Sequence, residues 1–255
     1  MNDLDFQGID IGYLELYGSL DGKNNTLSNI EISTSSGVEI GLFKVIDAGT
    51  LKNITFDNLN YSNNVAYNTQ VSAGLIAGTI QNGSTLSSIS IENSTMNFRT
   101  SSNYANVGAI SGVISNATVM NISMSNTQIN YIASNTSSTS HLYTGLFFGL
   151  ISSLDYNGKD SDVTIQNLSS SKNTLEHTAA SQTLNYPGLI AGYVTGRQSS
   201  PGITAISGFV STNDTLIIFT WPNSKDWTFG TIAQFNNVFT SNLDDLVDLN
   251  IVLPE

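Results

Sequence analysis

Two acidic residues, Asp57 and Glu92, are the sharpest candidates for catalysis in this sequence. Each directly follows a short apolar pattern and directly precedes an asparagine, so the two occupy equivalent places in successive repeats. A glycosidase needs two carboxyl groups about 5 to 9.5 Å apart on one face, and equivalent residues of adjacent turns in a stacked fold lie about 5 Å apart. The next repeat has Ser125 in this place, and no Arg or His falls in register to bind an acidic sugar. Outward-facing surface acids are therefore the preferred interpretation.

A second candidate site is the acidic segment 155–162, which could bind calcium. Calcium prefers several carboxylate and carbonyl oxygens from a flexible loop. The ligands would be Asp155, Asn157, Asp160 and Asp162. The segment does not match an EF-hand, because its glycine comes too early and Gln166 stands where the closing Glu would be. Since Asn-Gly is ordinary turn chemistry, we favour a solvated loop and predict no metal or cofactor, with calcium as the alternative.

The histidines, aromatic residues and sequons give weaker signals. His141 and His177 are the only histidines, and we expect both in solvent-exposed loops without catalytic partners. Rings that could stack on sugars are those of Tyr104, Tyr131, Tyr143, Trp221 and Trp227. The apolar run before Trp221 favours packing of the two tryptophans in a cap at the C-terminal end instead. Ten Asn-x-Ser/Thr sequons are present, but this composition yields about seven by chance, so they do not establish glycosylation.

An internal repeat positions these side chains. A glycine followed by two apolar residues recurs at intervals of 33, 34, 37 and 43 residues. The five openings begin at Gly41, Gly74, Gly108, Gly145 and Gly188. A second glycine stands at the fifth position of every opening except the first, which has Val45 there. The constant opening and the growing interval predict one structural turn per unit, with loops of variable length.

A second marker lies downstream of each opening and has the pattern of a strand with one buried face. Apolar residues stand at positions 1, 4 and 6 of windows that begin at Leu27, Leu51, Leu86 and Val119. Two residues after the last apolar position, an asparagine recurs as Asn58, Asn93, Asn126 and Asn167. The last unit has Asp160 in the first apolar position and is therefore degenerate. We expect Ile54, Ile89 and Ile122 to form one interior column, and the asparagines to form a hydrogen-bonded ladder at one turn.

Stacking of these units predicts the fold. About 33 residues bury too little apolar surface to fold alone, so neighbouring units must pair through parallel strands. The predicted fold is all-β, a right-handed parallel β-solenoid of about six coils, since right-handed crossovers are the default. Residues 1–210 would form this repeat domain, and residues 211–255 its C-terminal cap. The cap would include a helix over 242–249, because apolar residues recur there at helical spacing behind Ser241 or Asn242.

The stretch 17–30 (YGSLDGKNNTLSNI) and the motif GLIAG at 74–78 and 188–192 add a family resemblance. Together they resemble the GLUG-type repeat proteins, a family of microbial surface β-helices. The resemblance covers about residues 13–210, and Val45 and the longer units after Gly145 depart from its pattern. It implies a β-helix at a cell surface and assigns a functional role to no single residue.

Composition excludes several function classes. Charged residues make up 11% of the chain, against about 25% in an average soluble domain, and the charged helix formers that a helical bundle needs are missing. The formal net charge of −12 would repel a nucleic acid. The chain has no Cys and therefore no disulfide or thiolate site. No segment approaches the 18 consecutive apolar residues of a membrane span, so we expect no membrane insertion in this segment.

We therefore expect a cell-surface or secreted module, part of a longer precursor, that acts in adhesion or as a structural spacer. Its partner would be a host or neighbouring cell-surface protein or glycan, contacted by variable loops after Asn60, Phe98, Tyr131 and Ser169. The alternative is a polysaccharide lyase or glycosidase on the same scaffold, with Asp57 and Glu92 as its acids. An ice-binding surface would need Thr at one position of every turn, and the Thr residues show no such register.

Overall fold

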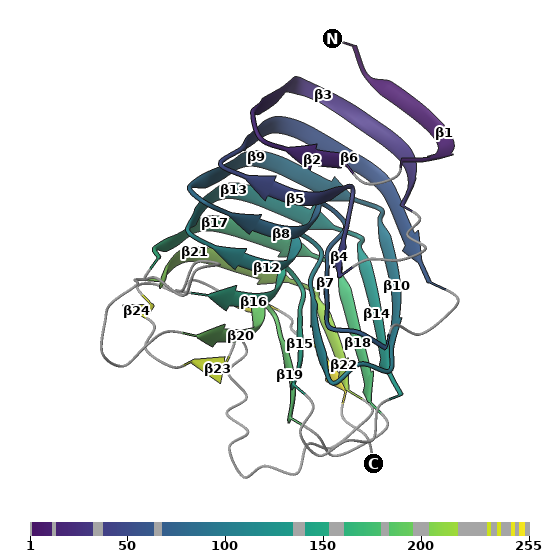
Figure 1. Ribbon diagram of the computed structural model, residues 1–255, viewed down its shortest axis with the longest axis vertical. Coiled ribbons are helices and arrows are strands. Elements are labelled where there is room, and N and C mark those ends of the chain that lie inside the picture. Colours follow the sequence, from purple (N-terminus) through teal and green to yellow (C-terminus); the bar gives the residue numbers. More distant parts are fainter. Residues whose placement is uncertain are drawn as a thin grey trace.

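The computed structural model describes residues 2–11, 14–32, 38–63, 68–134, 141–152, 161–179, 184–195 and 204–218, and the short strands at 234–235, 239–240, 246–247 and 250–252. Within these ranges the chain forms strands, turns and bends but no helix. The strands form three open sheets, and every pairing among them is parallel. Figure 1 shows the strands stacked one above another, with the N-terminus at one end of the stack.

The three sheets differ in size. The largest, of 14 strands, contains β1 (Leu4–Asp10), β3 (Ser19–Ile32), β6 (Thr50–Ser62), β9 (Ser84–Glu92), β10 (Thr95–Thr100), β13 (Ala117–Ser125), β14 (Gln128–Ala133), β17 (Val163–Ser171), β18 (Thr174–Ala179), β21 (Thr204–Thr212), β22 (Thr215–Ile218), β24 (Phe239–Thr240), β25 (Leu246–Val247) and β26 (Asn250–Val252). The seven-stranded sheet contains β2 (Leu14–Leu16), β5 (Phe43–Asp47), β8 (Ala77–Gln81), β12 (Ser111–Ser115), β16 (Phe148–Ser152), β20 (Ala191–Thr195) and β23 (Gln234–Phe235). The five-stranded sheet contains β4 (Glu39–Ile40), β7 (Val71–Ala73), β11 (Tyr104–Val107), β15 (His141–Gly145) and β19 (Leu184–Gly188).

The chain visits the three sheets in the same order in successive repeats. A strand of the five-stranded sheet is followed by one of the seven-stranded sheet and then by two of the largest sheet, as in β11, β12, β13 and β14. Each strand pairs with its counterparts in the neighbouring repeats, so that β13 lies between β9 and β17. This arrangement of stacked parallel strands fits a β-solenoid, and the all-β prediction is confirmed.

The interior consists of columns of equivalent apolar residues. Ile54 pairs with Ile89, and Ile89 with Ile122, as predicted, and all three are buried. In β9 and β13 the side chains alternate between the interior and the surface, because a strand has a two-residue period. The repeat therefore encodes the core directly.

The repeated glycines lie where the five-stranded sheet bends into the seven-stranded sheet. A Cβ atom on Gly41 would lie 2.8 Å from the carbonyl oxygen of Gly74 in the next repeat. A Cβ atom on Gly112 would lie 2.5 Å from the carbonyl carbon of Ser72 and 2.7 Å from the carbonyl oxygen of Asn106. A side chain at either position would overlap with backbone of another turn, so only glycine lets successive bends stack this closely.

The first repeat departs from the glycine pattern at a different residue from the one predicted. Phe43 pairs with Ala77 and Val45 with Thr79, so Lys44, not Val45, lies opposite Gly78. The bend of this repeat is one residue shorter than the bend of the next repeat. The residue opposite the second glycine is therefore the fourth of the opening and not the fifth. The Lys44 ammonium lies 3.7 Å from a Glu15 carboxylate oxygen and 3.9 Å from one of Glu39.

Residues in the left-handed backbone conformation mark two corners of each turn in the largest sheet. The first column, with φ from +53° to +66°, contains Asn24, Asn53, Ser88, Asn121, Asn167 and Gly208. The second, with φ from +50° to +58°, contains Asn29, Asn58, Asn93, Asn126, Lys172 and Asn213. Asn is enriched because its short polar side chain tolerates this conformation better than other residues with a Cβ atom.

The asparagine ladder is correct for Asn58, Asn93 and Asn126 but wrong for Asn167. Leu168 pairs with Ile122, which places Asn167 beside Asn121 in the first column. Ser170 takes the third apolar position of that unit and is buried although it is polar. Because an apolar residue was expected there, the sequence pattern was aligned five residues too early and looked degenerate. The same shift affects the first unit, where Leu27 pairs with Phe56 rather than with Leu51.

A buried polar ladder follows the second corner, one residue after the exposed asparagines. Its members are Ser94, Thr127, Asn173 and Asp214, each 1% exposed. The Thr127 backbone N–H donates to Asn173 Oδ1 at 2.8 Å, and the Asn173 N–H donates to Asp214 Oδ1 at 2.8 Å. This ladder satisfies backbone groups in the interior, whereas the asparagines of the second column bond to one another outside it, as from Asn58 Nδ2 to Asn29 Oδ1 at 2.7 Å.

Threonines also form a column, which corrects the view that they lack a register. Thr50, Thr85, Thr118 and Thr164 pair successively on the outer side of the largest sheet. The next outward column mixes Lys52, Ser87, Met120 and Gln166. The face is therefore not a uniform hydroxyl array.

The stacked strands continue past residue 210, after which the cap of the same domain is predicted to begin. Residue 210 lies inside β21, and β22 pairs with β18 on one side and β26 on the other. The predicted helix over 242–249 is wrong at Leu246 and Val247, which form β25 and pair with β21. Trp221 and Trp227 lie outside the described residues.

Candidate functional site

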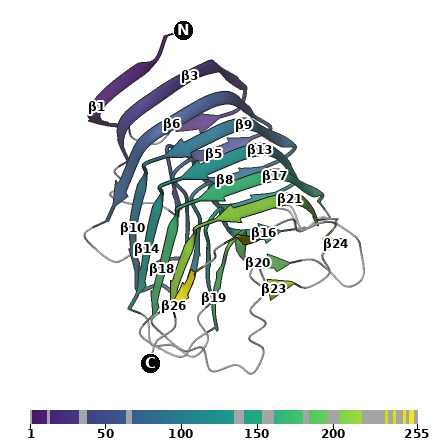
Figure 2. The same ribbon diagram turned by 180° about the vertical axis from the view of Figure 1, so that it is seen from behind.

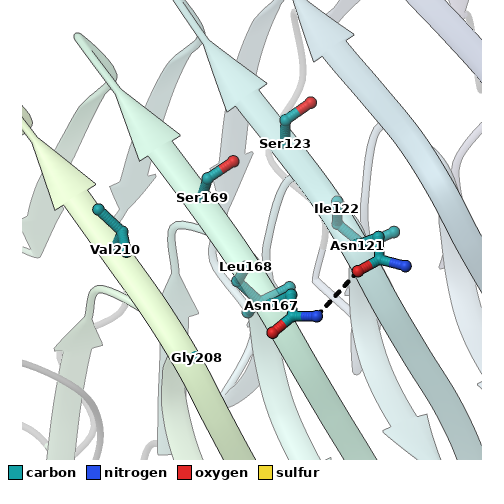
Figure 3. Close-up of a pocket in the computed structure, with 8 residues that line it drawn as sticks. All are labelled: Asn121, Ile122, Ser123, Asn167, Leu168, Ser169, Gly208 and Val210. Atoms are coloured by element: carbon teal, nitrogen blue, oxygen red, sulfur yellow. Dashed lines mark hydrogen bonds between the residues drawn. The ribbon is translucent and has the colours of Figure 1, made fainter. Parts of the chain in front are cut away.

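A shallow groove of about 490 Å³ crosses three neighbouring strands of the largest sheet at their first corner. Its lining comes from β13, β17 and β21, and consists of Asn121, Ile122, Ser123, Asn167, Leu168, Ser169, Gly208 and Val210. Figure 3 shows these side chains in ranks, with Ser123, Ser169 and Val210 on adjacent strands. The groove therefore runs across the strands, in the direction in which the turns stack.

The left-handed residues of the first corner create this groove. Each strand bends at Asn121, Asn167 and Gly208, where φ is +55°, +55° and +66°. The Asn167 Nδ2 donates to Asn121 Oδ1 at 2.9 Å, a bond drawn in Figure 3. At Gly208 a Cβ atom would lie 2.6 Å from Asn167 Oδ1, so the missing side chain leaves the groove open at β21.

The groove is lined by neutral groups that can donate and accept hydrogen bonds. Ser123 pairs with Ser169, and Ser169 with Val210, so two hydroxyl groups and one apolar side chain form a single outward-facing row across the strands. Ser123 Oγ donates to Ser90 Oγ at 3.0 Å, which extends the row by one turn. Amide and hydroxyl groups beside a half-exposed Val210 suit a ligand that presents both hydroxyl groups and C–H surface.

The register predicted for Asp57 and Glu92 is confirmed. The two residues pair across β6 and β9, and Ser125 follows in β13. Both carboxylates are half-buried and accept hydrogen bonds from neutral groups: Asn93 Nδ2 donates to Asp57 at 2.8 Å, and Ser90 Oγ donates to Glu92 at 2.7 Å. Their catalytic role stays a prediction.

The predicted calcium ligands fall largely outside the described residues. Asp155, Asn157 and Asp160 are among those not described, and Asp162 is exposed. Among the residues that the structure does describe, no three or more His, Cys, Asp or Glu side chains gather closely enough to hold a metal ion.

The prediction of exposed loop histidines is wrong. His177 lies in β18, is fully buried, and stacks on Tyr131 with ring centroids 4.9 Å apart. It extends a buried column of rings formed by Tyr61, Phe98 and Tyr131, which excludes Tyr131 from contact with a sugar. Burial raises the pKa of the Tyr131 hydroxyl. Histidine counts as a polar residue in the sequence pattern, which predicts exposure. In the structure the ring of His177 occupies the interior position of its turn that Tyr131 occupies in the preceding turn.

His141 lies in β15 and not in a loop, and it takes part in a surface cluster of rings. Its ring stacks on Tyr104 with centroids 5.3 Å apart and contacts the edge of Tyr143 at 6.2 Å. Tyr143 stacks on Tyr193 of β20 at 4.8 Å. Tyr104 is exposed, as expected for a ring available to a ligand, while the other rings are partly covered by one another.

The positions after which variable loops were predicted coincide only in part with the groove and with a second hollow. A second hollow of about 330 Å³ is lined by Ser62, Asn63, Asn97, Phe98, Arg99, Asn130 and Ile132. The variable loop expected after Ser169 is wrong, because only Lys172 and Asn173 separate β17 from β18, and Ser169 is part of the groove wall instead. The signal that would have located the groove is the recurrence of Asn-apolar-Ser at Asn121 and Asn167.

The part of the chain that the structure describes contains no helix that is long and apolar enough to cross a membrane. Comparisons of the chain with protein-family models, with curated proteins and with solved structures found no match.

Proposed function

We propose that this chain is a cell-surface or secreted β-solenoid module, part of a longer precursor, that acts in adhesion or as a structural spacer. Its solenoid is right-handed, because parallel crossovers take that hand, and comprises about six coils closed by a C-terminal cap. The GLUG-type motifs support the surface location. The net charge of −12 argues against nucleic acid as a partner.

The neutral groove at the first corner carries this proposal. It offers amides of Asn121 and Asn167 and hydroxyls of Ser123 and Ser169, all without a charged side chain in the lining. Such groups bind neutral, hydroxyl-rich ligands, so the preferred partner is a glycan of a host or neighbouring cell surface. Neighbouring turns are about 4.8 Å apart, and the Asn and Ser side chains of β13 recur on β17, so a polymeric ligand meets the same donors and acceptors on two successive turns.

A glycan array read for both binding and product release tests the proposal. Ser169→Arg places a long side chain in the groove from an exposed position, and Gln128→Arg makes the same exposed change on β14. We expect binding that Ser169→Arg reduces at least tenfold and Gln128→Arg leaves unchanged. Equal loss in both variants, or equal retention in both, would remove the groove as the adhesive surface.

A polysaccharide-active enzyme is the second candidate, and the pairing of Asp57 with Glu92 favours it. Residues in register on neighbouring strands lie about 4.8 Å apart along the backbone, close to the carboxyl separation of about 5 Å that retaining glycosidases use. The double variant Asp57→Asn/Glu92→Gln tests this assignment. Product release that disappears in this variant would replace adhesion by catalysis, whereas unchanged binding without turnover supports adhesion.

A further inference from the structure

The second hollow, of about 330 Å³, shares no lining residue with the groove. Figures 1 and 2 show β10 and β14 side by side, running at an angle to β9 and β13. Ser62 pairs with Asn97, and Asn97 with Asn130, so these polar side chains form one outward-facing row across β6, β10 and β14. Two residues further along, Arg99 pairs with Ile132, and both are exposed. The hollow therefore combines hydroxyl and amide groups with one cation and apolar surface.

The backbone of Arg99 is held by one side chain. The Asn63 amide nitrogen donates to the Arg99 carbonyl oxygen at 2.7 Å, and the Arg99 N–H donates to Asn63 Oδ1 at 2.8 Å. Asn63 is itself buried. Phe98 and Thr100 on either side of Arg99 point into the interior, so β10 presents the Arg99 side chain outward. The fold therefore fixes the point from which the guanidinium extends.

The positive charge of Arg99 is not neutralised by the part of the chain that the structure describes. Within the described residues its guanidinium forms no ion pair and no hydrogen bond. Glu176 pairs with Asn130 on the far side of β14, but it does not line the hollow. No Asp or Glu occurs in the segments that follow β6, β10, β14 and β18 in the sequence, 63–70, 101–103, 134–140 and 180–183. An exposed guanidinium without an acidic partner is suited to an anionic ligand.

The groups around Arg99 match a ligand that carries one carboxylate and several hydroxyls. A guanidinium presents its N–H donors in a planar fork that fits the two oxygens of a carboxylate. A phosphate carries more negative charge, which the net charge of −12 opposes more strongly. Asn97 Oδ1 accepts a hydrogen bond from Asn130 Nδ2 at 2.6 Å, so the Asn97 amide nitrogen can donate to a ligand hydroxyl. Ile132, 36% exposed, offers apolar surface to the C–H groups of a sugar ring.

An acidic peptide matches this surface less well than a sugar. β10 pairs with β14 along its whole length, and β6 together with the Asn63 side chain covers its other side. The main-chain groups of β10 are therefore already used, and a peptide cannot add to it as a strand. A volume of about 330 Å³ is near the lower limit of ligand pockets, about 300 Å³, and favours a compact ring over an extended chain.

We propose that the hollow beside Arg99 binds a uronic acid residue of an acidic polysaccharide. The Arg99 guanidinium binds the sugar carboxylate, and Asn97 and Ser62 form hydrogen bonds with ring hydroxyls. Ile132 packs against the C–H groups of the ring. This site differs from the neutral groove in its residues and in the charge of its ligand, and it does not rest on glycan binding in the groove.

Two sugar trimers of the same linkage, one of galacturonate and one of galactose, test the proposal in calorimetric titrations of the intact chain. We expect Arg99→Gln to weaken binding of the galacturonate trimer by about fivefold, the upper end for one exposed ion pair. Binding of the galactose trimer, which reports on the neutral groove, should not change. Failure of the galacturonate trimer to bind the unmodified chain, or equal affinity of this trimer for Arg99→Gln, would overturn the proposal.

A matched variant controls for net charge. Lys172→Gln removes one positive charge from an exposed residue that does not line the hollow, and it should leave the affinity for the galacturonate trimer unchanged. Equal weakening in Arg99→Gln and Lys172→Gln would mean that net charge, and not the hollow, attracts the sugar, and would overturn the proposal. A glutamate trimer that binds as tightly as the galacturonate trimer, with the same dependence on Arg99, would instead identify an acidic peptide as the ligand and also overturn it.

Discussion

Replacing Gly112 by alanine tests the structural role of the repeated glycine motif. The added Cβ would approach the Ala73 backbone nitrogen, and it would lie 2.5 Å from the Ser72 carbonyl carbon and 2.7 Å from the Asn106 carbonyl oxygen. Ordinary contacts between such atoms are about 3.5 to 4.0 Å. All three atoms belong to backbone in paired strands, so none can rotate away as the end of a side chain could.

We expect Gly112→Ala to lower the free energy of unfolding by about 3 kcal/mol, at the upper end of the usual cost of overpacking. The alanine gains about 0.4 to 1 kcal/mol by restricting the unfolded chain, and this gain is too small to compensate. For a chain of this size the loss corresponds to a fall in Tm of roughly 6 to 12 °C. Urea unfolding followed by circular dichroism measures it.

Two other glycines serve as matched controls. Gly18→Ala meets nothing within 4 Å and should be neutral or stabilising by up to about 1 kcal/mol. Gly83 also has open space around it but adopts φ +81°, so Gly83→Ala should cost about 1 to 2 kcal/mol through backbone strain alone. Surface substitutions usually change the free energy of unfolding by no more than about 0.5 kcal/mol. If the values for Gly112→Ala and Gly18→Ala differ by less than this, close stacking of the bends does not explain the motif.

Three further predictions concern two buried side chains and the carboxylate of Asp21. Phe98→Ala should cost about 3 to 5 kcal/mol in urea unfolding, because the ring is fully buried between two others. Phe98→Leu, which keeps most of the volume, should cost less, and equal losses would contradict the attribution of the cost to the cavity left behind. Asn173→Ala should cost about 1 to 3 kcal/mol by leaving the buried Thr127 N–H unsatisfied, and hydrogen exchange at Thr127 should rise; unchanged exchange there would refute the ladder. Hydrogen bonds from the Lys23 backbone and the Asn53 amide, with the charge of Lys52, lower the pKa of Asp21 from 3.8. The stability that this carboxylate contributes is therefore present above about pH 4 and is lost as the pH falls below it. Asp21→Asn should flatten the acid side of a plot of unfolding free energy against pH. An unchanged acid side would argue against this shift.

The sequence by itself determined the repeat, its parallel stacking and much of the core. Period-two apolar patterns placed Ile54, Ile89 and Ile122 in one column, which the pairing of β6, β9 and β13 confirms. The same counting put Asp57 beside Glu92. These predictions hold because equivalent residues in a stacked repeat must coincide once one apolar column is aligned.

Register across irregular units could not be obtained from the sequence. A buried serine at position 170 replaced an apolar residue and hid the true alignment of Asn167, while a bend shortened by one residue moved Lys44 into the place expected for Val45. Apolar periodicity cannot detect either change, because a polar residue whose hydrogen bonds are satisfied packs in the core as a small apolar one does.

The position and extent of the groove were decided by tertiary structure. The groove exists because Asn121, Asn167 and Gly208 turn left-handed at the same height on three adjacent strands. The sequence contains these residues 46 and 41 positions apart, and only the pairing of β13, β17 and β21 brings them side by side. His177 is interior for the same kind of reason, since its burial depends on the ring stacked against it from another repeat. Local composition determines which conformations a residue tolerates, whereas contacts between distant turns determine which surface it forms.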